Sequence, residues 1–165
     1  MIYFGVGIAA SVVAIDQISK FAVISMLAPY QGLSITPFLN LVLILNTGIT
    51  FGFFASNDTF TRWTLIVLAL IISIILMRWL ISAEGRYVCA ALGMIIGGAL
   101  GNVIDRLVHG AVVDFLDFHL YGWHWPAFNI ADMAITIGAA LMLLEAFVDN
   151  RRDDERKGQN QEGNK

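Results

Sequence analysis

The chain has 165 residues, of which 58% are hydrophobic and only 14% are charged. An average soluble domain is about 25% charged, so this composition excludes an ordinary soluble protein and indicates a polytopic membrane protein without a second large domain. The net charge of −3 averages over unlike regions, and outside the C-terminal tail no basic stripe is present, so we expect no nucleic-acid partner.

Four apolar segments are each long enough to cross roughly 30 Å of hydrocarbon, which takes about 20 helical residues. They lie at about 2–27, 63–80, 87–104 and 130–148. The expected fold class is therefore an all-α polytopic membrane protein with four transmembrane helices, in which residues 1–148 form one membrane domain. The first segment lacks a basic n-region and is expected to be a retained span, not a cleaved signal peptide. Residues 149–165 are charged and predicted to form a disordered tail.

Basic residues near the ends of the spans predict the orientation. Arg78 and Arg86 bracket the short connection 81–86, which should make the second and third spans antiparallel neighbours, and further basic residues follow the last span. With four spans these regions share one side, so both termini, including the tail, are expected to be cytoplasmic. Two longer loops then lie on the opposite side.

The first outer loop contains the aliphatic segment 37–46, bounded by Pro37 and Asn46, which suits a strand. The segment 47–52 then supplies a turn. We therefore expect a small extracytoplasmic β-structure in this loop. It could hold an extended peptide by strand addition or serve as a lid over the helix ends, and the pattern leaves both open.

The first span carries Asp16 and Lys20, which are four residues apart and can pair on one helix face. Such a pair inside a membrane commonly neutralises both charges, although Lys20 could instead contact a lipid or substrate headgroup. The single cysteine, Cys89, lies in an apolar run, without a histidine at the same depth, and is expected to face lipid or core.

The third span carries Gly93, Gly97 and Gly101 at four-residue spacing, which favours close helix contact. This contact would fix the polar set that follows, in which Asn102, Asp105 and Arg106 are expected to support a site.

The second outer loop and the fourth span carry the carboxylates Asp114 and Asp132. A carboxylate in hydrocarbon costs about 2.5–3.5 kcal/mol on insertion scales, so two of them near one membrane face suggest a site. Asn129 is placed to cap the fourth span, which would put Asp132 at a helical position where the helix dipole favours its charge. Capping explains Asp132 alone but does not explain Asp114.

Other residues of this loop have simpler interpretations. Tyr121, Trp123 and Trp125 fit an interfacial aromatic belt. Asp117 and His119 follow Asp114 closely, as polar residues of exposed loops often do, and no metal-binding spacing is present, so no metal and no cofactor are expected.

Two neighbouring carboxylates that cannot both ionise share one proton, as in aspartic proteases. The ionised member takes a proton from an attacking water, and the protonated member donates to the amide being cut. Two rival hypotheses are a proton- or ion-coupled carrier, which needs carboxylates distributed through the membrane depth, and a non-catalytic assembly factor held together by its glycine face.

The chain resembles the bacterial lipoprotein signal peptidases (signal peptidase II) up to about residue 148. The resemblance rests on blocks in matching order, which are Asp16-Gln-Ile-Ser-Lys20, Asn46-Thr-Gly48 with Phe51, Gly97-Gly-Ala-Leu-Gly-Asn-Val-Ile-Asp-Arg106, His109-Gly-Ala-Val-Val-Asp-Phe115 and Phe128-Asn-Ile-Ala-Asp132.

The resemblance implies an aspartic endopeptidase of the bacterial inner membrane with its active site toward the periplasm. Such an enzyme cuts prolipoproteins before a diacylglyceryl-modified cysteine, contacts membrane lipid and is blocked by globomycin-type inhibitors. It implies Asp114 and Asp132 as the catalytic pair. The matching supporting positions are Asp16, Lys20, Asn46, Gly48, Asn102, Asp105, Arg106 and Asn129.

One departure lies at Ile49 and Thr50, where the family usually has two small residues, often alanines. This difference concerns the rim of the cleft and inhibitor affinity, not the catalytic pair.

Overall fold

The computed structural model describes residues 1–29, 31–48 and 59–162, with the backbone alone for 149–162. Among these described residues, four helices are long and apolar enough to cross a membrane, as predicted. They are α1 (Ile2–Met26), α2 (Thr59–Ser82), α3 (Arg86–Val108) and α4 (Ile130–Glu162). α3 continues past the predicted end at 104 because its last turn carries Asp105 and Arg106, whose polar groups are bonded within the protein.

The last helix differs from the prediction for the tail. α4 continues as a helix to Glu162, where a disordered tail was expected from residue 149. Charged residues such as Arg and Glu are good helix formers, so an apolar span can extend into a polar helix. The division into a membrane domain and a tail stays a prediction.

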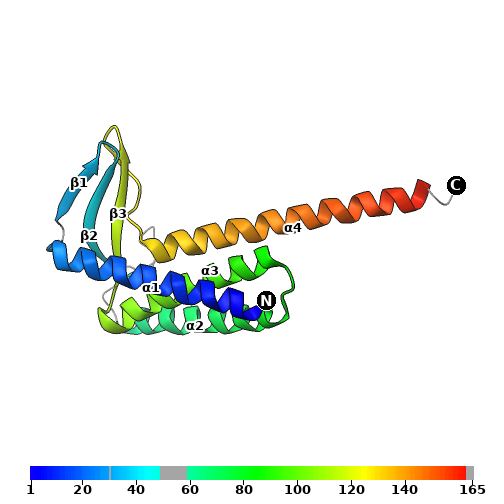
Figure 1. The fold of residues 1–165 in the computed structure, drawn as a ribbon. Coiled ribbons are helices and arrows are strands. Elements are labelled where there is room, and N and C mark those ends of the chain that lie inside the picture. The colour runs from blue at the N-terminus through cyan, green and yellow to red at the C-terminus, as the bar shows by residue number, and fades with distance from the viewer. Residues whose placement is uncertain (30, 49–58, 163–165) are drawn as a thin grey trace.

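The third helix forms the centre of the bundle (Figure 1). In the apolar stretch of α3, 61% of the residues are buried, against 17% in the corresponding stretch of each of the other three spans. Gly93 and Gly97 lie against the α1 backbone at Gly5 and Ala9, and Gly98 lies against Ala131 of α4. The predicted close helix contact is therefore confirmed, and it involves two neighbouring helices.

Gly97→Ala should destabilise the bundle, because a Cβ at this position would lie 2.6 Å from the carbonyl oxygen of Ala9. Backbone atoms cannot turn away, so the helices must separate, and overpacking of this kind costs about 1–3 kcal/mol. Gly7→Ala on α1 is the matched control, since nothing lies within 4 Å of its Cβ. The free energy of unfolding of both variants, measured in mixed detergent micelles, checks this prediction. Equal stability of the two variants would contradict a close contact between Gly97 and the α1 backbone.

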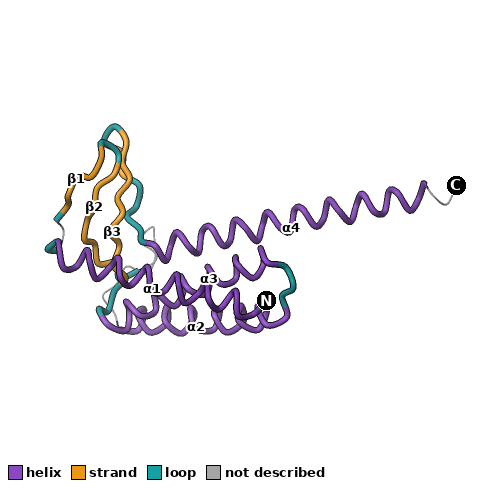
Figure 2. Tube along the Cα trace, in the orientation of Figure 1, coloured by secondary structure: helices purple, strands orange, loops and turns teal. Residues whose placement is uncertain are grey.

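In the part of the chain that the structure describes, an antiparallel sheet of four strands lies at one end of the bundle (Figure 2). Its order is β1 (Gly32–Thr36), β2 (Leu39–Asn46), β3 (Val112–Leu120) and β4 (Trp123–His124). The strand predicted at 37–46 is confirmed as β2. The expectation of β-structure in the connection between the first two spans alone was too narrow, because β3 and β4 lie between α3 and α4. The sequence of β3 concealed it, since Asp114 and Asp117 interrupt its apolar residues.

The sheet is joined to the helices by a small apolar cluster, in which Val23 of α1 packs with Leu43, Val113 and Phe115. In the register of β2 and β3, Ile44 is opposite Asp114. The start of α1 and the far end of α4 lie at the end of the bundle away from the sheet (Figure 1). Which side of a membrane each end faces stays a prediction.

Cys89 is fully buried in the cluster that joins α1, α2 and α3, with Leu80, Leu92 and Ile96 as neighbours. Of the two environments expected for it, the structure places it in the core.

Candidate active site

Asp114 lies near the start of β3, with only 2% of its surface exposed. Two amide side chains donate hydrogen bonds to its carboxylate. Asn46 Nδ2, at the end of β2, lies 2.9 Å from Oδ2, and Asn129 Nδ2, just before α4, lies 2.7 Å from Oδ1. Sheet pairing and the α4 N-terminus thus fix this carboxyl from both sides.

Asp132 lies in the first turn of α4. Asn129 Oδ1 accepts a hydrogen bond of 2.9 Å from the backbone N–H of Asp132, which confirms the predicted N-cap and places Asp132 at the third helical position. Asn102 Nδ2 of α3 donates to Asp132 Oδ1 at 2.8 Å. The helix dipole and this amide both favour a negative charge at Asp132.

Asn129 connects the two aspartates directly, because its Nδ2 donates to Asp114 while its Oδ1 accepts from Asp132. Asn102 Oδ1 accepts from Asn129 Nδ2 at 3.4 Å. The two carboxylates therefore belong to one hydrogen-bonded site at the junction of β3, α3 and α4, although no motif in the sequence shows that they meet.

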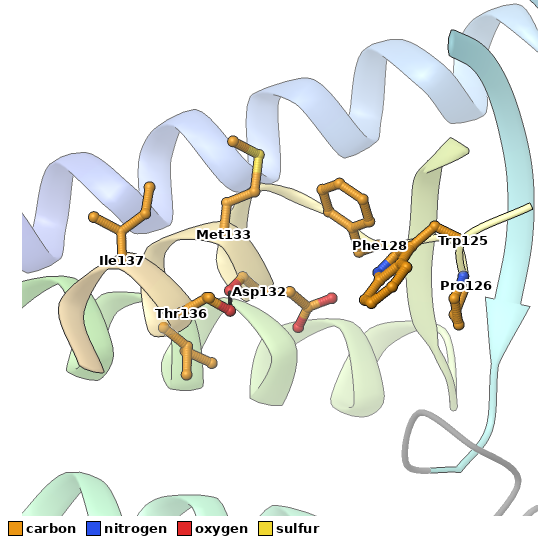
Figure 3. A pocket seen from close by; sticks show the side chains of 8 residues that line it. Trp125, Pro126, Phe128, Asp132, Met133, Thr136 and Ile137 are labelled. Atoms are coloured by element: carbon orange, nitrogen blue, oxygen red, sulfur yellow. Dashed lines mark hydrogen bonds between the residues drawn. The ribbon is translucent and has the colours of Figure 1, made fainter. Parts of the chain in front are cut away.

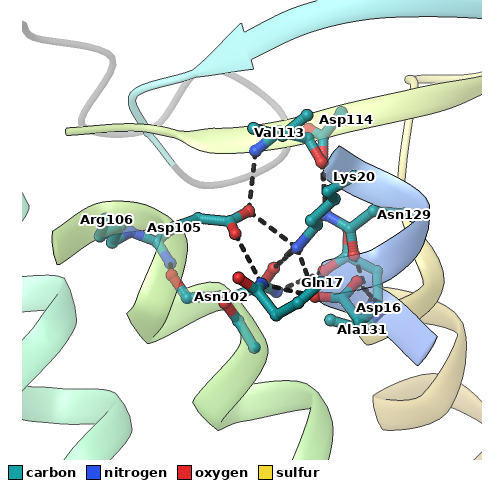
Figure 4. Close-up of polar contacts among 12 residues, drawn as sticks. Asp16, Gln17, Lys20, Asn102, Asp105, Arg106, Val113, Asp114, Asn129 and Ala131 are labelled. Carbon is teal, nitrogen blue, oxygen red and sulfur yellow. Dashed lines mark hydrogen bonds and ion pairs between the residues drawn. The ribbon is translucent and has the colours of Figure 1, made fainter. Parts of the chain in front are cut away.

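A buried charge cluster supports this site (Figure 4). Lys20 Nζ forms ion pairs of 2.7 Å with both Asp16 and Asp105, and its side chain is only 3% exposed. Lys20 also donates to Asn102 Oδ1 at 3.2 Å. The predicted pairing of Asp16 with Lys20 is confirmed, and Asp105 joins it from α3.

Both carboxylates of this cluster also accept backbone hydrogen bonds. Asp105 Oδ2 accepts from Val113 N at 3.0 Å, next to Asp114 on β3. Asp16 Oδ1 accepts from Ala131 N at 2.9 Å, next to Asp132 on α4. The charge cluster thus holds the backbone beside each of the two candidate catalytic residues.

Arg106 closes the network on the side where β2 ends. Its guanidinium donates to the carbonyl oxygens of Asn102 at 3.3 Å and Gly48 at 3.4 Å. Gly48 N donates to Asn46 Oδ1 at 3.0 Å, which leaves Asn46 Nδ2 directed at Asp114. The departure at 49–50 lies outside the described residues.

The structure brings every predicted site residue into this network, and it adds Gln17. Gln17 Nε2 donates to Asp105 Oδ1 at 2.9 Å and to Asp16 Oδ2 at 3.2 Å. In the sequence, the only indication that Gln17 belongs to the site was its position next to Asp16 in the first-span motif.

Asp117 and His119 lie away from the aspartate pair. Asp117 accepts hydrogen bonds from Asn40 Nδ2 at 3.0 Å and pairs with His124 Nδ1 at 2.9 Å. His119 stacks on His124, with ring centroids 5.1 Å apart. These residues form a separate group toward the far end of the sheet.

The environment of Asp114 is suited to a group that holds a proton. Burial, the largest influence, raises its pKa from 3.8 to about 7. The hydrogen bond from Asn46 opposes this shift, and the charge of Asp132 adds to it. A carboxyl group with this pKa can donate and accept protons near neutral pH.

An apolar groove of about 520 Å³ extends from Asp132 along α4 (Figure 3). Trp125, Pro126 and Phe128 form one side, and side chains of α4 that include Met133 and Ile137 form the other. The carboxylate of Asp132 is the charged group in this lining, so the groove joins a reactive centre to an apolar surface.

Known proteins match this chain along most of its length. The family model described as signal peptidase (SPase) II matches residues 8–148. A lipoprotein signal peptidase of Paraburkholderia phymatum is 47% identical over 141 residues, which cover 84% of each chain. One from Alteromonas mediterranea is 41% identical over 153 residues, covering 92% of this chain and 84% of that one.

Solved structures show the same fold. A structure described as a bacterial membrane enzyme aligns with a TM-score of 0.79 at 31% identity, covering 88% of both chains. A second structure described in the same words aligns with a TM-score of 0.75. Since the family model covers residues 8–148 and a relative that is 47% identical matches 84% of the chain, the chain belongs to the signal peptidase II family.

Proposed function

We propose that this protein is an aspartic endopeptidase that removes signal peptides from prolipoproteins, cutting before a diacylglyceryl-modified cysteine. The observation that carries the proposal is the sharing of Asn129 by Asp114 and Asp132 in one buried, hydrogen-bonded site. The relatives named lipoprotein signal peptidase supply the substrate class. We place the protein in the bacterial inner membrane, with this site toward the periplasm.

In the proposed mechanism Asp114 holds the shared proton and Asp132 is ionised. Asp132 removes a proton from water as the water attacks the amide carbonyl carbon. Asp114 donates a hydrogen bond to the carbonyl oxygen and then its proton to the leaving nitrogen. The burial of Asp114 and its pKa of about 7 support this division of roles, as does the position of Asp132 on the groove.

The carrier alternative is less well supported. It needs carboxylates at several membrane depths, whereas Asp16, Asp105, Asp114 and Asp132 belong to one network beside the sheet. Strand addition to the sheet stays a prediction for how the peptide is held, and so does the alternative of a lid over the helix ends. We also expect a globomycin-type cyclic peptide to compete with the substrate.

Cleavage of a purified prolipoprotein tests the function. The full-length protein in lipid nanodiscs is incubated with one precursor in two forms, with and without diacylglyceryl on its cysteine, and the products are identified by mass spectrometry. We expect a new N-terminus at the cysteine from the modified form alone. Cleavage of both forms at equal rates, or cleavage elsewhere, would contradict the proposed specificity.

The rate of cleavage should fall as the pH rises through about 7, because Asp114 then loses the proton that the mechanism needs. The loss should approach tenfold per pH unit. Asn46→Ala removes a hydrogen bond that favours the ionised form of Asp114, so this limb of the pH profile should move to higher pH. The pH dependence of kcat/KM, measured for the wild type and for Asn46→Ala, checks this prediction. A shift of the limb to lower pH in the variant would contradict its assignment to Asp114.

A further inference from the structure

An apolar surface runs from the exposed side of α4 onto the far tip of the sheet. Trp125 is the link, because it lines the groove beside Met133 and Ile137 and also a second hollow at the sheet tip. We call the residues of that hollow, other than its two histidines, the aromatic strip; they are Phe38, Phe118, Leu120, Trp123 and Trp125. All are exposed, from 41% for Phe118 to 85% for Trp123.

The sheet exposes almost no charge. Residues 31–48 contain no Asp, Glu, Lys or Arg, and residues 112–128 contain only Asp114 and Asp117, both of which are buried. Sheets that face water keep charged side chains at their surfaces and edges, which prevents aggregation. Contiguous exposed apolar surface of this kind marks an interaction site. The polar side chains of the hollow are His119 and His124, and His124 is paired with Asp117.

The position of the sheet identifies the partner. Its strands run across the helix axes, and its tip projects past the bundle on the side of α4 (Figures 1 and 2). Since the helices span the membrane, a sheet that crosses their ends lies along the membrane surface. The tip therefore lies beside the bundle, over lipid and not over the ends of the helices.

We propose that the aromatic strip is seated in the interfacial layer of the lipid leaflet beside α4, with phospholipid as its partner. Trp side chains favour this layer because they pair a large apolar ring with an N–H donor. The strip is continuous with the lipid-facing surface of α4, so lipid can cover both without a break. The sheet is then held at both ends. At the bundle, Val113 N donates a hydrogen bond to Asp105, and at the tip the aromatic strip contacts lipid.

Depth-dependent fluorescence quenching tests this proposal without reference to catalysis. Trp63 and Trp79, which lie half-exposed on α2, are replaced by Phe, and Trp123 or Trp125 is left as the single tryptophan. The full chain is reconstituted at low protein-to-lipid ratio in vesicles of phosphatidylcholine and phosphatidylglycerol. Some vesicles carry bromine close to the headgroup end of the acyl chains, others close to the chain ends. A variant that retains only Trp63, which lies at the end of a span, is the reference for the interfacial layer.

We expect headgroup-proximal bromine to quench Trp123 and Trp125 several-fold more than bromine at the chain ends, and aqueous iodide to quench both weakly. Strong quenching by iodide at either position, without quenching by brominated lipid, would show a water-exposed tip and overturn the proposal. Protection from both quenchers would show that protein covers the tip, such as a second copy of the chain, and would overturn it equally.

Discussion

Asp114→Asn and Asp132→Asn should each lower the rate of prolipoprotein cleavage by about 10²–10⁴-fold, the usual contribution of a positioned acid or base. Each substitution keeps the side-chain volume and removes the ability to exchange a proton. Asp114 is joined to Asp132 through Asn129, so loss of either carboxyl removes the pair as a unit. The double variant should therefore be no slower than the slower single variant.

Asp117→Asn is the matched control, since Asp117 is a buried carboxylate on the same strand that bonds to Asn40 and His124 instead of the pair. It should keep near-wild-type turnover. Single-turnover cleavage in nanodiscs, with unfolding curves for every variant, separates chemistry from folding. If a well-folded Asp114→Asn or Asp132→Asn variant cleaves at the wild-type rate, the proposed pair is wrong.

Lys20→Met should lower the free energy of unfolding by about 3–5 kcal/mol, because it leaves two buried carboxylates without their cation. Lys20 Nζ lies 2.7 Å from both Asp16 and Asp105, and all of these side chains are at most 3% exposed. Activity should fall as well, since Lys20 also orients Asn102, which donates to Asp132. Unfolding in mixed detergent micelles, together with the cleavage assay, measures both effects.

Arg86→Gln is the control for Lys20→Met, because Arg86 lies at the start of α3 and packs over Phe4, away from the site. A triple variant with Lys20→Met, Asp16→Asn and Asp105→Asn tests the cause, since a neutral network lacks the unpaired charges. It should recover much of the lost stability. If the triple variant is less stable than Lys20→Met alone, unpaired charge is not the reason for the loss.

Several features of this chain were determined by local sequence. The spans follow from the length of their apolar runs, and the pairing of Asp16 with Lys20 follows from their spacing on one helix. The N-cap at Asn129 and the strand β2 follow in the same way from short-range preferences. Each depends on residues a few positions apart, whose relative geometry a helix or strand fixes without help from the rest of the fold.

The site itself depends on contacts that local sequence does not specify. Asp114 and Asp132 meet because β3 pairs with β2, and because α4 packs closely on α3 at Gly98. The strand β3 was missed since its two aspartates interrupt the apolar pattern that would reveal it. The burial of these two aspartates is stabilised by amide side chains from distant elements, Asn46 for Asp114 and Asn40 for Asp117.

The resemblance to a known family named the site residues, but it did not show their partners. The bond from Asp105 to Val113 N and the bonds of Gln17 join α1, α3 and β3 across most of the chain. Such pairings are decided by the packing of whole elements, which brings a donor and an acceptor together in a space without water. Sequence alone therefore determined the spans, the cap and the candidate residues, whereas the tertiary structure decided that they form one buried network.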